Sequence, residues 1–274
     1  MVPTIFCRYR PPPPLDRYID HLWYWEGIAP THGRDRILPD GSCSIVINLA
    51  EDEIRNYSGA RDECVESYSG AVLMGAHSRY SVIDNREQTA VIGVTFHPGG
   101  TWPFFAPAAD ELHNDHANLG DLWGSAGRTL RERVLAEATP MARLAVVERE
   151  LLAQAIRPLQ RRPEVEFAVR RLSQPADAPS IERLSERCGL SARRFTRLFA
   201  IEVGLTPKLY ARIKRFERVF ATFGQATPDW SELAVACGYF DQSHLIRDCR
   251  LISGFTPGEL HSRWNGNGHH VPLD

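Results

Sequence analysis

The feature that most constrains how this chain folds is a pattern that occurs twice near its C-terminal end. The first copy runs from Leu184 to Pro207, and the second from Leu233 to Pro257. Each copy contains a Cys-Gly pair and ends in Gly-Leu-Thr-Pro or Gly-Phe-Thr-Pro. Matching residues lie 49 positions apart before an internal turn and 50 after it, so the second turn has one extra residue, Phe240. Such self-similarity indicates one supersecondary unit that is built twice.

Each copy predicts a helix-turn-helix. Gly189 ends the first helix, because glycine tolerates the left-handed conformation found past a helix end. Ser191 can then cap the next helix through its side-chain oxygen, and Asp241 can do so in the second copy. Within these second helices, Phe195, Leu198 and Phe199 are expected on the inner face of the first copy, and Leu245 and Cys249 on that of the second. The outer faces are expected to carry Arg193, Arg194, Thr196 and Arg197 in the first copy, and Gln242, Ser243, Ile246 and Arg247 in the second.

The stretch between the two copies predicts a rigid helical spacer. Thr206 suits the N-cap and Pro207 the first helical position. Apolar residues then recur at helical spacing up to Phe223. A rigid spacer matters because two recognition helices reach one face of B-DNA when they lie roughly 34 Å apart, one turn of the duplex.

These motifs resemble the DNA-binding domain of the AraC/XylS family of bacterial transcription regulators, over about residues 179–264. The resemblance implies two helix-turn-helix motifs that enter successive major grooves of an asymmetric site. One position departs from the family pattern, because Cys249 stands where an aromatic core residue is usual. Base-edge contacts are implied for Arg193, Thr196, Arg197, Gln242, Ser243, Ile246 and Arg247, and phosphate contacts for Arg194, Lys208, Arg212 and His244.

Two other functional classes remain open at this point. A helix pair with a basic outer face is often only a solvated hairpin, and a repeat that has lost DNA binding would be a protein-interaction module. An enzyme could also use the N-terminal part of the chain. The outward arginines and Gln242 favour the DNA reading, since Arg pairs with guanine and Gln with adenine for roughly 1–3 kcal/mol of discrimination each.

The distribution of charge agrees with DNA binding at one end of the chain. Residues 173–264 hold 13 Lys and Arg against 10 Asp and Glu, whereas residues 1–172 hold 19 against 23. The start of the chain lacks the apolar core of a signal peptide, and no run of about 18 apolar residues occurs. We therefore expect a cytoplasmic protein without membrane contact, whose six cysteines are reduced.

Residues 1–124 predict a β-rich domain. Short apolar runs around Ile45–Ile47, 71–76 and 89–96 alternate with Pro- and Gly-containing turns, which is typical of a small barrel or sandwich. The half also resembles the sensory domains of some AraC-type regulators, which are often cupin-like barrels. A barrel could hold a small-molecule effector, with Trp23, Trp25, Trp102, Phe104 and Phe105 as candidate wall residues, or these aromatic residues could simply form the core.

Histidines raise the question of a metal in this half. The candidates are His77, His97, His113 and His116. The sequence has no His-x-His motif here, and we expect His113 and His116 in a loop, so we predict no metal and no other cofactor. A nucleophile turn of the Gly-x-Ser-x-Gly type and a phosphate-binding glycine loop are also missing from the sequence, which argues against an enzyme.

The remaining segments complete an α+β organisation. Residues 125–172 predict a helical connector that could form a dimer interface, and residues 179–264 an all-α DNA-binding domain whose first helix is capped by Ser180. Residues 173–180 predict a linker, and the tail after Trp264 predicts disorder. The expected partners are double-stranded DNA, RNA polymerase, an effector and a second copy of the chain.

Overall fold

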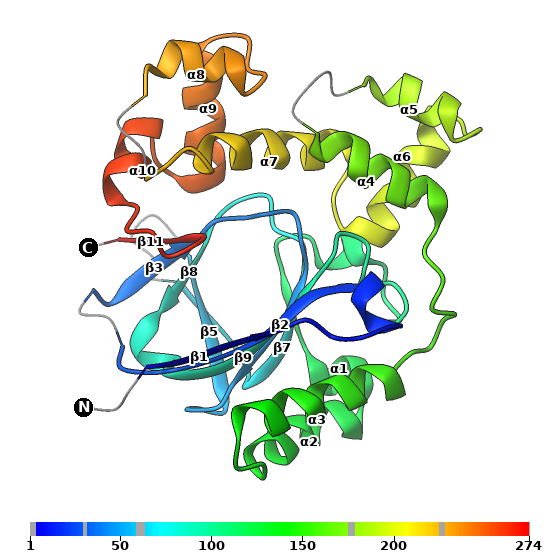
Figure 1. Cartoon of the computed structure of the whole chain (residues 1–274), viewed down its shortest axis with the longest axis vertical. Coiled ribbons are helices and arrows are strands. Elements are labelled where there is room, and N and C mark those ends of the chain that lie inside the picture. Colours follow the sequence, from blue (N-terminus) through cyan, green and yellow to red (C-terminus); the bar gives the residue numbers. More distant parts are fainter. Residues whose placement is uncertain (1–3, 30–31, 59–63, 175–178, 225–227, 274) are drawn as a thin grey trace.

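The computed structural model describes residues 4–29, 32–58, 64–174, 179–224 and 228–273. Strands dominate the N-terminal part and helices the C-terminal part (Figure 1), which confirms the predicted fold class. The strands are β1 (Ile5–Tyr9), β2 (Ile19–Glu26), β3 (Arg34–Ile37), β4 (Ser44–Asn48), β5 (Glu53–Ser58), β6 (Cys64–Ser69), β7 (Ala71–Met74), β8 (Ser81–Asp84), β9 (Ala90–Phe96), β10 (His116–Asn118) and β11 (His270–Pro272).

Two antiparallel sheets form the β-rich part. One has the strand order β1-β2-β9-β4-β7-β10, and the other β11-β3-β8-β5-β6. The three strands predicted from apolar runs correspond to β4, β7 and β9. A closed barrel stays a prediction. The short 3-10 helices η1 (Leu15–Arg17), η2 (Asn85–Glu87) and η3 (Ala109–Leu112) lie in the connections.

The central strands β4, β7 and β9 of the first sheet are buried on both faces, which explains the uninterrupted apolar run of β4. Ile45 and Ile47 point into the main core, while Val46 joins a smaller core between the two sheets. At one point this inner space is narrow. A Cβ on Gly93 would lie 2.0 Å from the ring of Trp23, so glycine is needed for the indole to lie across β9.

The predicted connector consists of helices that pack in two different places. The helices α1 (Leu119–Trp123), α2 (Ser125–Leu135) and α3 (Pro140–Ala153) lie below the first sheet (Figure 1). Thr139 caps α3, and Pro140 is its first residue, where the missing amide hydrogen costs the helix nothing. By contrast, α4 (Pro163–Ser173) packs against the helices of the C-terminal part. The predicted linker falls largely on residues 175–178, which lie outside the described residues.

The C-terminal part holds the two predicted motifs. The first consists of α5 (Ile181–Arg187) and α6 (Ala192–Val203), and the second of α8 (Trp230–Ala236) and α9 (Gln242–Ser253). The spacer is α7 (Pro207–Phe220), and α10 (Pro257–Arg263) takes the corresponding place after the second motif. Figure 1 shows the two motifs at opposite ends of α7, which lies across one end of the sheets.

Polar contacts join the helical part to the β-rich part. Arg36 of β3 donates a hydrogen bond to the Ser253 carbonyl at the end of α9, and its guanidinium lies 4.1 Å from the ring centroids of both Tyr80 and Phe255. Near the middle of α7, Lys214 donates to the Asp40 carbonyl at 2.7 Å. The two parts therefore meet through directed contacts as well as apolar packing.

The prediction of a disordered tail is wrong. Beyond α10 the chain forms β11, which pairs antiparallel with β3 in the second sheet. Trp264 Nε1 donates to the Gly268 carbonyl, and Val271 is fully buried, so both ends of the segment are held. The composition of the tail is rich in Gly and Asn, and the strand that it completes lies more than 230 residues earlier in the sequence. Local sequence therefore gave no sign of this pairing.

Candidate nucleic-acid interface and inner cavity

The first motif has the geometry that its sequence predicts. Ser191 accepts a hydrogen bond from the Arg194 amide and so caps α6, and Gly204 ends the helix in the left-handed conformation with φ 87°. Phe195 and Phe199 are buried. On the outer face, Arg193, Arg194 and Arg197 are exposed. Thr196 is partly buried.

The second motif repeats this arrangement. Asp241 accepts from the His244 amide at the start of α9, and Gly254 ends the helix with φ 76°. The extra residue of the turn, Phe240, is 88% exposed, so it lengthens the turn without entering the core. The buried residues Leu245 and Cys249 confirm the predicted inner face. On the outer face, Gln242, Ser243 and Arg247 are exposed, whereas Ile246 is partly buried instead of exposed as expected.

The candidate phosphate ligands lie in different surroundings. Arg194 and Lys208 are exposed near the starts of α6 and α7. Arg212 is instead bound to the buried carboxylate of Asp248, at 2.7 Å from Nη2. His244 packs edge-on against the ring of Tyr239. Among the residues that the structure describes, no ion pair holds Arg194 or Lys208, whereas Arg212 connects α7 to α9 through Asp248.

One recognition-helix arginine contacts the N-terminal part. The guanidinium of Arg197 forms an ion pair with Asp110 of η3, in which the side chains are 64% and 23% exposed. The approach is close, since a Cβ on Gly204 would lie 3.2 Å from the Ala109 carbonyl oxygen. Asp110 therefore binds the guanidinium for which the family resemblance implies a base contact.

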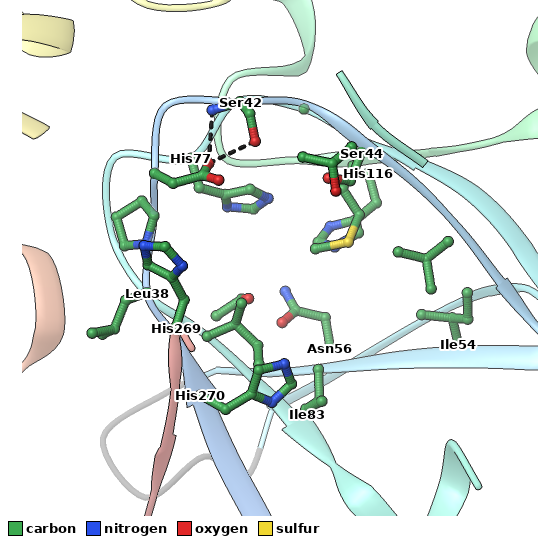
Figure 2. Close-up of a pocket in the computed structure, with 18 of the residues that line it drawn as sticks. Leu38, Ser42, Ser44, Ile54, Asn56, His77, Ile83, His116, His269 and His270 are labelled. Atoms are coloured by element: carbon green, nitrogen blue, oxygen red, sulfur yellow. Dashed lines mark hydrogen bonds between the residues drawn. The ribbon is translucent and has the colours of Figure 1, made fainter. Parts of the chain in front are cut away.

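A cavity of about 210 Å³ lies between the two sheets (Figure 2). Its apolar wall comes from both sheets and its polar wall includes four histidines. Of the five predicted wall residues, Trp23 lines this cavity. Phe104 and Phe105 are buried in the main core, Trp102 lies under the guanidinium of Arg157, and Trp25 is outside the lining.

Two of the cavity histidines are shielded from solvent, His116 fully and His77 in part. Burial lowers the pKa of His77 to about 3 and that of His116 to about 4, because desolvation penalises the charged imidazolium. Their ring centroids are 5.2 Å apart, so a charge on one would also disfavour a charge on the other. Both rings are therefore neutral at pH 7. His116 lies in β10, not in the loop that its sequence suggested.

Lowering the pH from about 7 to about 5 is expected to destabilise the β-rich part by about 1–2 kcal/mol through His116. In the unfolded chain this histidine has a pKa near 6.5 and takes up a proton, whereas the folded group does not. The folded protein therefore keeps its full stability above the pKa of the unfolded histidine. It loses stability as the pH falls from there toward the pKa of the folded group, about 4. Urea unfolding at both pH values measures the change. A His116→Gln variant should show a smaller loss, and an equal loss would exclude His116 as its source.

The other candidate metal ligands do not gather at one point. His113 Nε2 lies 3.0 Å from the Ser78 hydroxyl, and His97 is half-buried beside the entry to β2. Within the described ranges, no three His, Cys, Asp or Glu side chains converge as a metal site would require. Likewise, none of the described helices combines the length and apolar character needed to cross a membrane.

Two domain families match parts of the chain. Residues 184–263 match a family described as a helix-turn-helix domain, and residues 7–118 match a domain of unknown function, DUF6597. A comparison with curated proteins gives no match. The helix-turn-helix match covers both copies of the repeat and the spacer between them.

Solved structures give weak similarities. A DNA-binding transcriptional dual regulator from Escherichia coli K-12 is 20% identical with a TM-score of 0.33, covering 39% of this chain and 96% of that one. ToxT from Vibrio cholerae with a bound unsaturated fatty acid is 8% identical with a TM-score of 0.47, covering 97% of this chain and 99% of ToxT. ToxT bound to (E)-4-(8-methylnaphthalen-1-yl)but-3-enoic acid is 7% identical with a TM-score of 0.48, covering 94% and 98%. These values do not indicate a shared ligand.

Proposed function

We propose that this chain is an AraC-type DNA-binding transcription regulator rather than an enzyme, and that it reads two successive major-groove segments of one duplex site. The observation that carries the proposal is the placement of α6 and α9 at opposite ends of one helix, α7 (Figure 1). At about 1.5 Å per residue, its 14 residues span roughly 21 Å and so separate the two recognition helices, as reading of two successive groove segments requires.

In this proposal the exposed outer faces read bases and the flanking cations fix the register. Arg197 and Arg247 occupy equivalent positions in the two motifs, and each could pair with a guanine. Arg194, Lys208 and the amides at the helix starts would engage phosphates, which carry no sequence information themselves. The second motif can also use Gln242, which suits adenine.

We also propose a three-part organisation of 1–124, 125–172 and 179–264. The first part would bind an effector, and the connector could support a dimer. RNA polymerase would be a partner once the protein is on DNA. An effector would act by binding one arrangement of the two ends of the chain better than another. The ion pair between Arg197 and Asp110 supports this view. An arrangement that keeps the pair would hold the arginine away from DNA, and an arrangement that breaks it would free the arginine to contact a base.

Binding-site selection with the purified full-length protein tests the DNA proposal, at a stated and near-physiological salt concentration because phosphate contacts make affinity salt-dependent. We expect one enriched, asymmetric site with two short blocks about one helical turn apart. A symmetric site, or a single block, would contradict reading by two unlike motifs of one chain. Failure of the folded protein to enrich any sequence would count against specific reading by this arrangement.

Replacing Asp110 with alanine is expected to strengthen DNA binding up to about fivefold. Arg197 is 64% exposed, so water screens its ion pair with Asp110, and screened pairs of this kind are worth about 0.2–1 kcal/mol. Titration of the selected duplex measures the gain. Glu132→Ala is the matched control, since it removes the same charge from the exposed side of α2. An equal gain in both variants would mean that the change in overall charge, and not the release of Arg197, strengthens DNA binding.

A further inference from the structure

The last residues of the chain form part of the wall of the inner cavity. His269 and His270 line it, and β11 extends the second sheet beside β3 (Figure 2). The backbone pairing places His270 opposite Ile37, and the Leu38 amide donates to the His269 carbonyl at 2.9 Å. These residues follow α10 after a short loop. The DNA-binding part thus supplies one edge of a cavity that otherwise belongs to the β-rich part.

The tail is held at this edge by buried groups. The carboxylate of Asp35 in β3 is 2% exposed, and it lies 3.2 Å from Nδ1 of His270 and 2.9 Å from Nε2 of His32. The ring of His269 stacks on Phe220 at the end of α7, with 5.5 Å between centroids. One end of the spacer helix therefore touches a residue that lines the cavity.

Three polar atoms of the cavity lining are buried without a hydrogen-bond partner among the described residues. They are Nε2 of His77, Nδ1 of His116 and Oδ1 of Asn56. His116 is only 7% exposed, and Figure 2 shows its ring directed toward the cavity. An unpaired buried polar group costs about 1–3 kcal/mol, so a molecule that pairs with these atoms would recover that cost on binding.

The charged groups around the cavity indicate which ligand charge it can accept. The carboxylate of Asp40 accepts bonds from the amide and hydroxyl of Ser42, and Arg55 is paired with Glu51 and Glu87. His77 and His116 are neutral at pH 7. A charged ligand would lose its hydration, and the charged groups that it could meet in the wall are already engaged, Asp40 by Ser42 and His269 by Glu217 at 3.6 Å, so its burial is costly. Much of the remaining wall is apolar and includes Trp23, Ile37, Val46, Ile54, Met74 and Ile83.

We propose that this cavity binds a small, uncharged, mainly apolar molecule with a hydroxyl or carbonyl group, and that the docked tail forms part of its site. The hydroxyl or carbonyl would pair with the unsatisfied atoms of His77, His116 and Asn56. Ligand binding and docking of β11 would then stabilise each other by the same factor, since coupling between two equilibria is reciprocal. The proposal rests on the regulator function, and it supplies the route by which the ligand acts on the DNA-binding part.

A charge series of equal size tests the site in the full-length protein at pH 7. Benzyl alcohol is the uncharged probe, with benzylamine and benzoate as its cationic and anionic counterparts. We expect saturable binding of benzyl alcohol, at least about fivefold tighter than either charged probe. In amide hydrogen exchange, saturating benzyl alcohol should slow residues 269–273 and 34–38 by a similar factor. Tighter binding of benzoate or benzylamine, or no saturable binding by any probe, would overturn the proposed ligand site.

Variants separate the site from its coupling to the tail. Asp35→Asn weakens the anchor of His270 and should reduce both tail protection and affinity for benzyl alcohol. Asn267→Ala, at an exposed position of the same tail, is the matched control and should change neither. Probe binding that leaves exchange of the tail unchanged would overturn the coupling. Each of these results can occur with normal binding-site selection, whereas loss of selection would instead contradict the regulator proposal.

Discussion

Replacing Arg197 with alanine is expected to weaken binding to the selected DNA site by about 1–3 kcal/mol, with a much smaller loss on random DNA. The side chain extends from the exposed face of α6, six residues after the cap Ser191. A guanidinium that pairs with a guanine edge loses a base-specific contact when removed, whereas a phosphate contact would be lost on any sequence. Titrations of both duplexes at two salt concentrations measure the difference.

Arg247→Ala provides the comparison within the same molecule. It occupies the equivalent position in α9 and is exposed, and we expect it to relax a base position in the other block of the site. Arg197 also has an intramolecular partner, so the double variant with Asp110→Ala should show how much of the Arg197 effect comes from that ion pair. An equal loss on specific and random DNA in Arg197→Ala would refute the base-reading role.

The helix-turn-helix motifs could be predicted because their signals are local. Ser191, Asp241 and Thr206 each cap a helix within three residues of the amide they bind, and Gly204 and Gly254 end helices by their own backbone conformation. Periodicity then separates inner from outer faces. The outer-face assignment was less accurate for Thr196 and Ile246, because burial at the margin of a helix face depends on how closely the neighbouring helix approaches.

The inner cavity could not be predicted because its parts come from distant segments. Asn56, His77, His116 and His270 belong to different strands or loops, and nothing in their spacing brings them together. The five aromatic residues predicted as cavity walls belong to the part of the chain that holds the cavity, but Trp23 alone of the five lines it. Whether a strand residue faces the cavity or the core depends on strand register, and that was not readable for β3, β5, β8 and β10.

Buried acidic groups were the other feature hidden from the sequence. Asp35 and Asp248 occur in polar surroundings along the chain and look like surface residues. Each is buried because cationic or imidazole groups from remote elements, such as His270 and Arg212, reach it in the fold. The same two acids attach the tail to β3 and the second recognition helix to the spacer. The contacts that connect the elements thus depend on tertiary pairing more than on local propensity.

Replacing Asp248 with alanine is expected to destabilise the second motif by about 2–3 kcal/mol. Its side chain is 4% exposed, and it joins α9 to α7 by ion pairs with Arg212 at 2.7 Å and Arg215 at 3.5 Å. Removing one partner of a fully buried pair costs about 3–5 kcal/mol because the other charge is left unpaired. Here the arginines are 31% and 25% exposed, so water compensates them in part and the loss should be smaller.

Amide exchange of α9 and thermal unfolding of the full-length protein measure this loss. Asp248→Asn keeps the shape of the side chain and removes its charge, so it should fall between wild type and alanine. Asp110→Ala breaks an ion pair whose arginine is 64% exposed and should cost less than about 1 kcal/mol of stability. If the buried pair sets the position of α9, Asp248→Ala should also lose the DNA block read by the second motif while keeping the other block. Unchanged exchange in α9 would mean that apolar packing around Leu245 and Cys249 positions the helix without the ion pairs.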